Sequence, residues 1–242
     1  MISIIGIGPG GSAASLTQEA LDAIRSAEAG MYVGEMIGSE IKALFAPERL
    51  RTGRIPESDV LAALELAASL GTNFALLVPG DPSLYSGQRD RERSLGQYVE
   101  WLRSRGFAHR VLPGISSWQA LCARIGLDMT DPSRSQSVFV TSVERLLAKQ
   151  DSQQLASTSI ESVLRLRPTL VLFQSYRDRK EILSLLRTHY PPTTEVVLGY
   201  KVSWPGEERI VRRTLAELDL DKLGDEMLKH TLMIVLSEEF RL

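Results

Sequence analysis

Gly80 and Asp81 are the first candidates for chemistry in this chain because they follow a strongly apolar run. Residues 74–78 are all apolar, and the run stops at residues 79–82, which read Pro-Gly-Asp-Pro. A buried strand that opens into a loop is typical of this pattern. In open α/β sheets ligands bind outside the carboxyl ends of strands, so a backbone that a ligand can approach and one fixed carboxylate predict a binding site. A surface turn that only reverses the chain is the alternative.

A glycine-rich loop follows the first apolar run of the chain. Residues 2–5 are mainly apolar, residues 6–11 read Gly-Ile-Gly-Pro-Gly-Gly, and a helical pattern comes next. This is the order of a dinucleotide site, but Pro9 lacks a backbone donor and no glycine follows Gly8 at the third spacing of the fingerprint. We therefore expect Gly8, Pro9 and Gly10 to let a bulky ligand lie against the backbone rather than to hold pyrophosphate.

A third loop has a similar design. An apolar stretch ends at Pro113 and Gly114, and either Ser116 or Ser117 can cap a helix that we expect to run to residue 125. An ordinary capped helix explains either serine taken alone. Three loops of this kind in one chain indicate more than ordinary turns that contain glycine.

Taken in order, the three loops resemble the tetrapyrrole methylase family, S-adenosylmethionine-dependent enzymes that methylate precorrins and uroporphyrinogen. The family pattern is Gly-x-Gly-Pro-Gly, then a Gly-Asp-Pro loop, then Pro-Gly-(Ile/Val)-Ser-Ser, and all three stand here at suitable spacing. The resemblance continues through residues 135–141, 170–173 and 200–205, so it covers nearly the whole chain. One departure follows Gly-Pro-Gly, where the family continues Gly-Asp-Pro and residues 11–13 read Gly-Ser-Ala.

The resemblance implies an enzyme that takes S-adenosylmethionine as its cofactor and a tetrapyrrole as its acceptor, with no metal. The residues expected to bind the cofactor are Pro79, Gly80, Asp81, Leu84, Tyr85, Ser116, Ser117, Phe173, Gln174, Val197 and Thr231. The residues expected to bind the substrate are Gly8, Pro9, Gly10, Arg89 and Lys201. The two cations are chosen because the acceptor carries carboxylates, which arginine and lysine bind. No catalytic side chain is assigned.

Three functions remain open. Residues 135–138 (Ser-Gln-Ser-Val) and 203–207 (Ser-Trp-Pro-Gly-Glu) resemble the branch of the family that methylates C11 of precorrin-4 or its cobalt form. Residues 16–21 and 120–127 are also similar to the branch that methylates C5. The third alternative is a protein that binds a nucleotide or tetrapyrrole without turnover. Methylation of a precorrin at C11, in cobalamin biosynthesis, is the function that we favour.

Composition excludes several other classes. The net charge of −2 provides no general field for nucleic acid or a membrane surface, and no targeting signal or long apolar segment is visible. We therefore expect a cytoplasmic protein. Cys122 is expected to be a core thiol, and the three histidines, His109, His189 and His230, have no partner at metal-ligand spacing. No metal site is predicted.

The order of apolar runs predicts the fold class: α/β, with two α/β domains and an interdomain cleft for the small-molecule site. The N-terminal domain, residues 1–113, should hold a parallel sheet, because strands alternate with helical patterns there. The C-terminal domain, residues 114–242, should hold a mixed sheet, because its last strands have short connections. Strands are expected at residues 2–5, 29–33, 74–78, 108–112, 137–141, 169–173, 195–200, 208–213 and 231–236. Helices are expected at residues 17–27, 39–45, 58–69, 88–103 and 116–125.

A homodimer is expected mainly because the resembled family forms homodimers. Trp101 and Trp118 add weak support, since both look exposed on their predicted helices and need to be buried somewhere. The stretch of residues 150–167 is rich in serine and glutamine and is expected to be a polar insert without chemistry.

Overall fold

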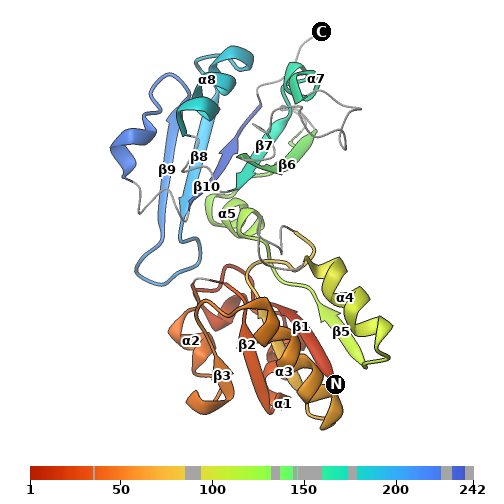
Figure 1. Cartoon of the computed structure of the whole chain (residues 1–242). Coiled ribbons are helices and arrows are strands. Elements are labelled where there is room, and N and C mark those ends of the chain that lie inside the picture. The colour runs from red at the N-terminus through yellow and green to blue at the C-terminus, as the bar shows by residue number, and fades with distance from the viewer. Residues whose placement is uncertain are drawn as a thin grey trace. The chain divides into compact units, whose positions relative to one another are not determined.

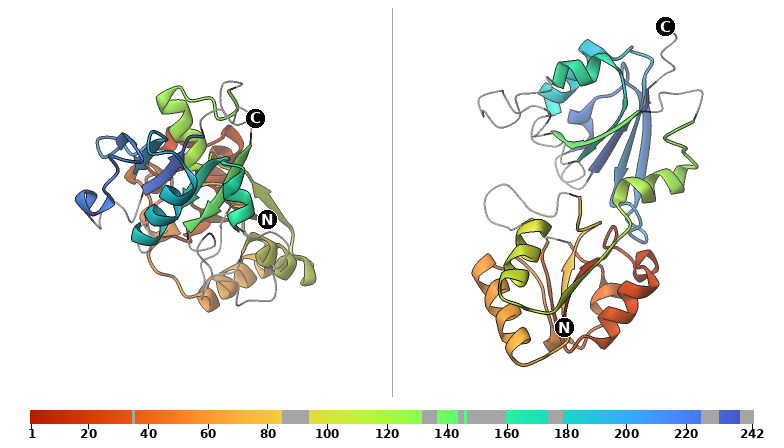
Figure 2. Two further views of the ribbon diagram at one scale, coloured as in Figure 1. Left: turned by 90° about the horizontal axis from the view of Figure 1, so that it is seen from above. Right: turned by 90° about the vertical axis from the view of Figure 1, so that its right-hand side faces the viewer.

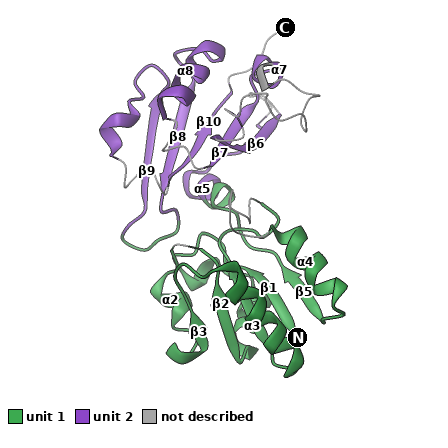
Figure 3. Ribbon diagram, in the orientation of Figure 1, with its two compact units in different colours: residues 1–120, 203–206 green, residues 121–202, 207–242 purple. Residues whose placement is uncertain are grey.

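The computed structural model describes residues 1–34, 36–84, 94–131, 137–143, 146, 160–173, 179–224 and 231–237. Its contacts divide the chain into two compact units, one of residues 1–120 with 203–206 and one of residues 121–202 with 207–242 (Figure 3). Each unit contains a five-stranded sheet (Figure 1). The predicted domain limits of 1–113 and 114–242 stay a prediction, because compactness alone does not define a domain that folds independently.

The first unit is built on a sheet in which all strand pairs are parallel, in the order β3-β2-β4-β1-β5. Its strands are β1 (Ile2–Gly6), β2 (Ala29–Tyr32), β3 (Leu50–Arg51), β4 (Phe74–Val78) and β5 (His109–Leu112). Every residue of β1 and β4 is buried. Strands that are covered on both faces read as continuous apolar runs, which is why these two were clear in the sequence.

Helices cover both faces of this sheet (Figure 2). They are α1 (Gln18–Ser26), α2 (Ser39–Lys42), α3 (Glu57–Ser69) and α4 (Leu95–Ser104), with short 3-10 turns η1 (Ala13–Ser15) and η2 (Pro47–Arg49). The start of α5 (Ser117–Ile125) also belongs to this unit. On one face Ile24 of α1 and Ile41 of α2 share an apolar cluster with Ile5. On the other face Leu64 of α3 and Leu102 of α4 pack in a cluster with Ile4 and Leu76.

The second unit contains a mixed sheet in the order β6-β7-β10-β8-β9. Its elements are β6 (Val138–Ser142), α7 (Ile160–Arg165), β7 (Thr169–Phe173), α8 (Arg179–His189), β8 (Glu195–Tyr200), β9 (Arg209–Thr214), η3 (Leu220–Leu223) and β10 (Thr231–Val235). Only β6 and β7 pair in parallel, whereas β8 and β9 form an antiparallel hairpin. One face of the sheet packs against Leu183 and Leu186 of α8.

The α/β class and the contrast between a parallel and a mixed sheet are confirmed. Of the predicted helices, the one at residues 39–45 ends earlier, at Lys42, and the one at residues 88–103 begins at Leu95 within the described residues. Strand β3 was not predicted, because two residues are too short to show a pattern, and α8 was also missed. Among the described residues, no helix combines the length and the hydropathy that crossing a membrane requires.

Candidate functional site

The three motif loops meet at the carboxyl ends of β1, β4 and β5, and they pack backbone against backbone. The amide of Gly80 donates to the carbonyl of Gly8 at 2.7 Å, and the amide of Gly8 donates back to Gly80 at 3.2 Å. A Cβ added to Gly114 would lie 2.1 Å from the carbonyl oxygen of Gly80, and a Cβ on Gly6 would lie 2.5 Å from the amide nitrogen of Gly114. Only glycine fits at such separations. The structure therefore brings the three loops together at one edge of the sheet.

Gly8 and Gly80 also need glycine for their backbone conformation. Their φ angles are +65° and +68°, in the left-handed region that other residues rarely adopt. A Cβ added to Gly80 would meet no atom of the described residues within 4 Å, so one side of this residue is open with respect to them. A ligand can approach the backbone there without meeting a side chain of Gly80.

Asp81 fastens two of the loops to each other. One carboxylate oxygen accepts from the amide of Ser83 at 2.8 Å and from the Ser83 hydroxyl, and the other accepts from the amide of Gly114 at 3.1 Å. The carboxylate is therefore held in place by donors from its own loop and from the loop that precedes α5. The sequence showed that a carboxylate stands here, but not that it links residues 33 positions apart.

The third loop leads directly into α5, which begins at Ser117. Ser116 is buried, its amide donates to the side chain of Gln119 at 3.1 Å, and its carbonyl accepts from the amide of Ala120 at 3.1 Å. Gln119 thus satisfies one of the free amides at the start of the helix. The indole nitrogen of Trp118 in the first turn is buried and has no hydrogen-bond partner in the part of the chain that the structure describes.

Two side chains that were not predicted as site residues hold residues 9–13, which include the end of the glycine-rich loop. The indole nitrogen of Trp204 donates to the carbonyl of Pro9 at 3.0 Å. A carboxylate oxygen of Glu40 on α2 accepts from the hydroxyl of Ser12 at 2.7 Å and from the amide of Ala13 at 3.0 Å. The Ser12 hydrogen bond, followed by that of the Ala13 amide, lowers the pKa of Glu40. No local pattern could have joined Pro9 to a residue 195 positions away.

Three of the described residues that we expected to bind the cofactor, Phe173, Val197 and Thr231, belong to the second unit. Strand register places Phe173 one residue beyond the Leu172–Met233 pair and Thr231 opposite Tyr200, so both lie at the same end of the sheet. Side chains alternate between the faces of a strand, which puts Phe173 and Val197 on one face and Thr231 on the other. Val197 is fully buried opposite Ile234. Their roles toward the cofactor stay a prediction. Because the side chains of Thr231 and Phe173 lie on opposite faces, Thr231 could contact a ligand beside Phe173 only through its backbone.

Lys201 follows the same end of this sheet, after β8. It adopts a left-handed backbone conformation with φ +44°, and its ammonium group pairs with the carboxylate of Glu207 across the hairpin. That hydrogen bond raises the pKa of Lys201. Lys201 is therefore charged and already paired, so binding an acceptor carboxylate would require Glu207 to share or release it. Tyr85, Arg89 and Gln174, the remaining predicted contacts, lie outside the described residues.

The thiol and the described histidines form no centre of their own. Cys122 is buried in α5, and burial raises the pKa of its thiol to about 11. His109 lies with its Nδ1 at 2.8 Å from the carbonyl oxygen of Phe107. Among the residues that the structure describes, no three His, Cys, Asp or Glu side chains lie close enough together to hold a metal ion.

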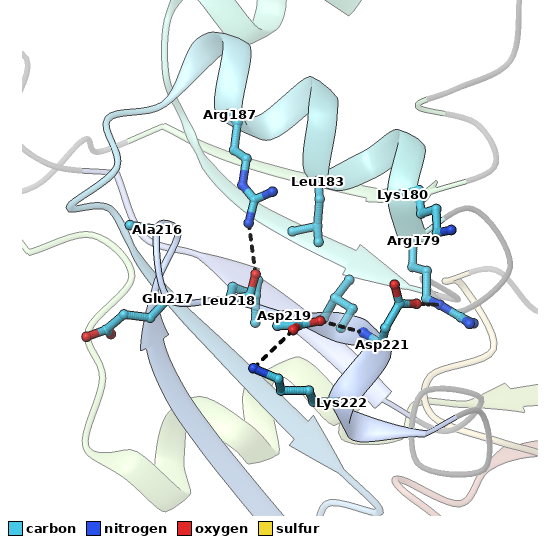
Figure 4. A pocket seen from close by; sticks show the side chains of 11 residues that line it. Arg179, Lys180, Leu183, Arg187, Ala216, Glu217, Leu218, Asp219, Asp221 and Lys222 are labelled. Atoms are coloured by element: carbon cyan, nitrogen blue, oxygen red, sulfur yellow. Dashed lines mark hydrogen bonds and ion pairs between the residues drawn. The ribbon is translucent and has the colours of Figure 1, made fainter.

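A cavity of about 480 Å³ lies in the second unit between α8 and the segment around η3 (Figure 4). Two ion pairs lie in its lining: Arg179 pairs with Asp221 at 2.6 Å, and Lys222 pairs with Asp219 at 3.3 Å. Arg187 donates to the carbonyl of Leu218 at 2.9 Å. None of the predicted site residues lines this cavity, and the pair of Arg179 and Asp221 links α8 to η3.

Comparison with known proteins supplies the family. The model of the Tetrapyrrole (Corrin/Porphyrin) Methylases matches residues 1–219. The chain is 32% identical to the precorrin-4 C(11)-methyltransferase of Rhodococcus erythropolis over 90% of this chain and 83% of that protein. It is 26% identical to the enzyme of the same name from Pseudomonas aeruginosa over 98% and 89% of the two chains.

A solved structure of a cobalt precorrin-4 methyltransferase has the same fold. It superimposes with a TM-score of 0.81 at 21% identity and covers 97% of this chain and 93% of that one. A uroporphyrin-III C-methyltransferase from Thermus thermophilus, solved with S-adenosylhomocysteine, gives a TM-score of 0.70 at 23% identity over 97% and 91% of the chains. The match to the family model over most of the chain confirms the resemblance. This protein belongs to the tetrapyrrole (corrin/porphyrin) methylases and is an S-adenosylmethionine-dependent methyltransferase.

Proposed function

We propose that this protein methylates C11 of precorrin-4, or of its cobalt form, in cobalamin biosynthesis. The observation that carries a methyltransferase site is the packing of the three motif loops at one sheet edge, where Gly80 leaves its backbone open to a ligand. The choice of precorrin-4 is supported by the relatives from Rhodococcus erythropolis and Pseudomonas aeruginosa. The Ser-Trp-Pro-Gly-Glu segment of residues 203–207 adds to that support.

The residues around Gly80 fit S-adenosylmethionine. When bound, this cofactor would supply an electrophilic methyl group on a sulfonium: an electron-rich ring carbon of the acceptor would attack the methyl carbon in line, and the electrons of the C–S bond would leave with S-adenosylhomocysteine. Gly80 admits the donor to the backbone, and Pro79 and Leu84 flank that approach along the loop. Asp81 holds a negative charge in a fixed place, which suits a cationic ligand. Ser116 and Ser117 offer polar groups at the start of α5, and Phe173, Gln174, Val197 and Thr231 remain the proposed contacts of the adenine.

The acceptor would lie against the glycine-rich loop. Gly8, Pro9 and Gly10 present backbone without bulky polar side chains, which suits a broad ring system. Lys201 and Arg89 are the proposed partners of its carboxylates, because a charge-assisted pair of this kind is stronger than a neutral hydrogen bond. This chemistry requires orientation and exclusion of water rather than a nucleophilic side chain, so no general base is assigned.

We also propose a homodimer in the cytoplasm. Trp101 gives little support to the dimer, because it already has partners within the chain. Its ring contacts that of Phe107 at an interplanar angle of 67°, with the centroids 5.9 Å apart, and the guanidinium of Arg105 lies over it. Family resemblance therefore carries the proposal. Light scattering of the purified protein at micromolar concentration should report twice the chain mass, and a monomer would refute the dimer.

Incubation of the purified protein with S-adenosylmethionine and a precorrin mixture tests the proposed reaction. We expect a singly methylated product whose new methyl group NMR places at C11. A methyl group at C5 would identify the second branch of the family. Calorimetric binding of S-adenosylhomocysteine without turnover on any precorrin would favour the non-catalytic binding protein, and no binding at all would contradict the assigned site.

A further inference from the structure

Trp204 lies directly on the backbone of the glycine-rich loop. It stands in the turn between β8 and β9, within residues 203–206, which belong to the first compact unit. Besides its hydrogen bond to Pro9, its ring leaves no room above Gly11. A Cβ added to Gly11 would lie 2.5 Å from Cγ of Trp204 and 2.7 Å from the carbonyl oxygen of Ser203.

The turn that presents Trp204 is strained. Among the described residues, three that are not glycine have a left-handed backbone, and two of them, Lys201 at φ +44° and Ser203 at φ +64°, flank this turn. Such conformations cost free energy and persist where the surrounding structure imposes them, often at functional sites. The tip of this turn is therefore held in one conformation that places the indole on the loop.

Other residues hold the rest of the loop, whereas Trp204 holds the carbonyl of Pro9. The carbonyl of Gly10 accepts from the amide of Gly38 at 2.6 Å, and Glu40 binds Ser12 and the amide of Ala13. Pro9 has no amide to donate, so its carbonyl is the group through which its peptide is anchored, and Trp204 is the partner. Removal of the indole would release the Pro9 carbonyl and loosen residues 10 and 11 beside it. The link between Asp81 and Gly114, next to the proposed donor site, would remain.

We propose that Trp204 is a positioning residue for the tetrapyrrole acceptor: it holds residues 9–11 in the shape against which the ring lies. The inference rests on the proposed function of this loop as the acceptor's wall. It assigns Trp204 no contact with the methyl donor, whose proposed loop is fastened by other bonds. Loss of Trp204 should therefore separate acceptor affinity from donor affinity.

Kinetics of Trp204→Ala and Trp204→Phe test this inference. For Trp204→Ala we expect the KM for the precorrin to rise about tenfold, while the Kd for S-adenosylhomocysteine changes by less than about twofold. Trp204→Phe keeps a flat ring over Gly11 but loses the donor to Pro9, so a rise of about threefold is expected. Gly11→Ala should raise the KM for the precorrin as Trp204→Ala does, because its methyl group would displace the indole. Gly96→Ala is the matched control, since its Cβ would meet nothing closer than 4.0 Å.

Hydrogen exchange measures the anchoring without any acceptor. In Trp204→Ala the amide of Gly38, which donates to Gly10, should exchange faster, whereas the amide of Gly80 should not. An unchanged precorrin KM in Trp204→Ala, or an equal loss of donor affinity, would overturn the proposal. If the wild-type protein methylated no precorrin, the proposed function would fail. Exchange at Gly38 would still decide whether Trp204 anchors the loop, and unchanged exchange there would overturn the inference.

Discussion

The glycine loops of the first unit and the charged cavity of the second unit are built on opposite principles. At the loops, Gly6, Gly80 and Gly114 bring backbone to backbone at separations that exclude any side chain. At the cavity, long charged side chains line the hollow, and some of them pair directly, as Arg179 does with Asp221 (Figure 4). Change at a close-packed backbone cannot be absorbed, whereas an exposed ion pair contributes little to stability. The site that we propose therefore lies where side chains are missing, at the glycine loops, and not at the hollow in the surface.

Gly114→Ala should have the largest effect. If it had none, the close packing of the glycine loops would not matter for stability or binding. Its methyl group would lie 2.1 Å from the carbonyl oxygen of Gly80, and both partners are backbone that cannot rotate away. Overpacking of this kind costs about 1–3 kcal/mol. We expect a lower melting temperature and loss of S-adenosylhomocysteine binding by calorimetry. Gly96→Ala adds its methyl group in open space on α4, so it should bind S-adenosylhomocysteine as the wild-type protein does and melt at the same temperature or slightly higher.

Asp81→Ala should cut methyl transfer strongly, since it removes both the charge and the link to Gly114. We expect kcat/KM to fall at least about tenfold, which corresponds to about 1.4 kcal/mol. The variant should also melt somewhat earlier than the wild-type protein, because the link to Gly114 is structural. Asp81→Asn separates the two roles: it keeps one accepting oxygen but loses the charge. Near-normal turnover of the alanine variant would reduce Asp81 to a turn residue.

Lys201 tests whether the second unit takes part in acceptor binding. Lys201→Ala should raise the apparent KM for the tetrapyrrole about tenfold, about 1.4 kcal/mol, and leave donor affinity almost unchanged. Glu207→Gln is the informative partner variant, since it removes the carboxylate that now pairs with the ammonium group and should lower that KM. An equal loss of donor affinity in Lys201→Ala would instead place the lysine beside the adenosyl group. If neither variant affected either ligand, Lys201 would serve only the hairpin.

Arg179→Ala should have the smallest effect, and it tests the charged cavity of the second unit. Arg179 lowers the pKa of Asp221, so the pair stabilises the fold above the ordinary pKa of a carboxyl group and stops doing so as pH falls through the lowered value. The guanidinium and the carboxylate are both partly exposed, so solvent screens the pair. Melting temperatures of variant and wild type should therefore nearly coincide at neutral pH and converge fully in acid. Methyl transfer should not change, and a large loss of turnover would make the cavity part of the site.

Much of the fold was open to prediction from local pattern. The buried runs at β1 and β4 and the contrast between βα alternation and short strand connections were enough to predict one parallel and one mixed sheet. Helix α8 was missed although Ile182, Leu183 and Leu186 lie at helical spacing, so the signal was present. Strand β3 carried no such signal, because two residues pair with β2 only when the sheet is already formed.

The sequence by itself determined where backbone must come close: glycines after apolar runs, at positions that only glycine can occupy. That is a local property, since φ angles and the missing Cβ belong to single residues. Tertiary structure alone decided what holds those loops: Asp81 on Gly114, Glu40 on Ser12 and Trp204 on Pro9, over separations of 33, 28 and 195 residues. A hydrogen bond between distant residues depends on how the sheets and turns bring them together, and no spacing along the chain records that.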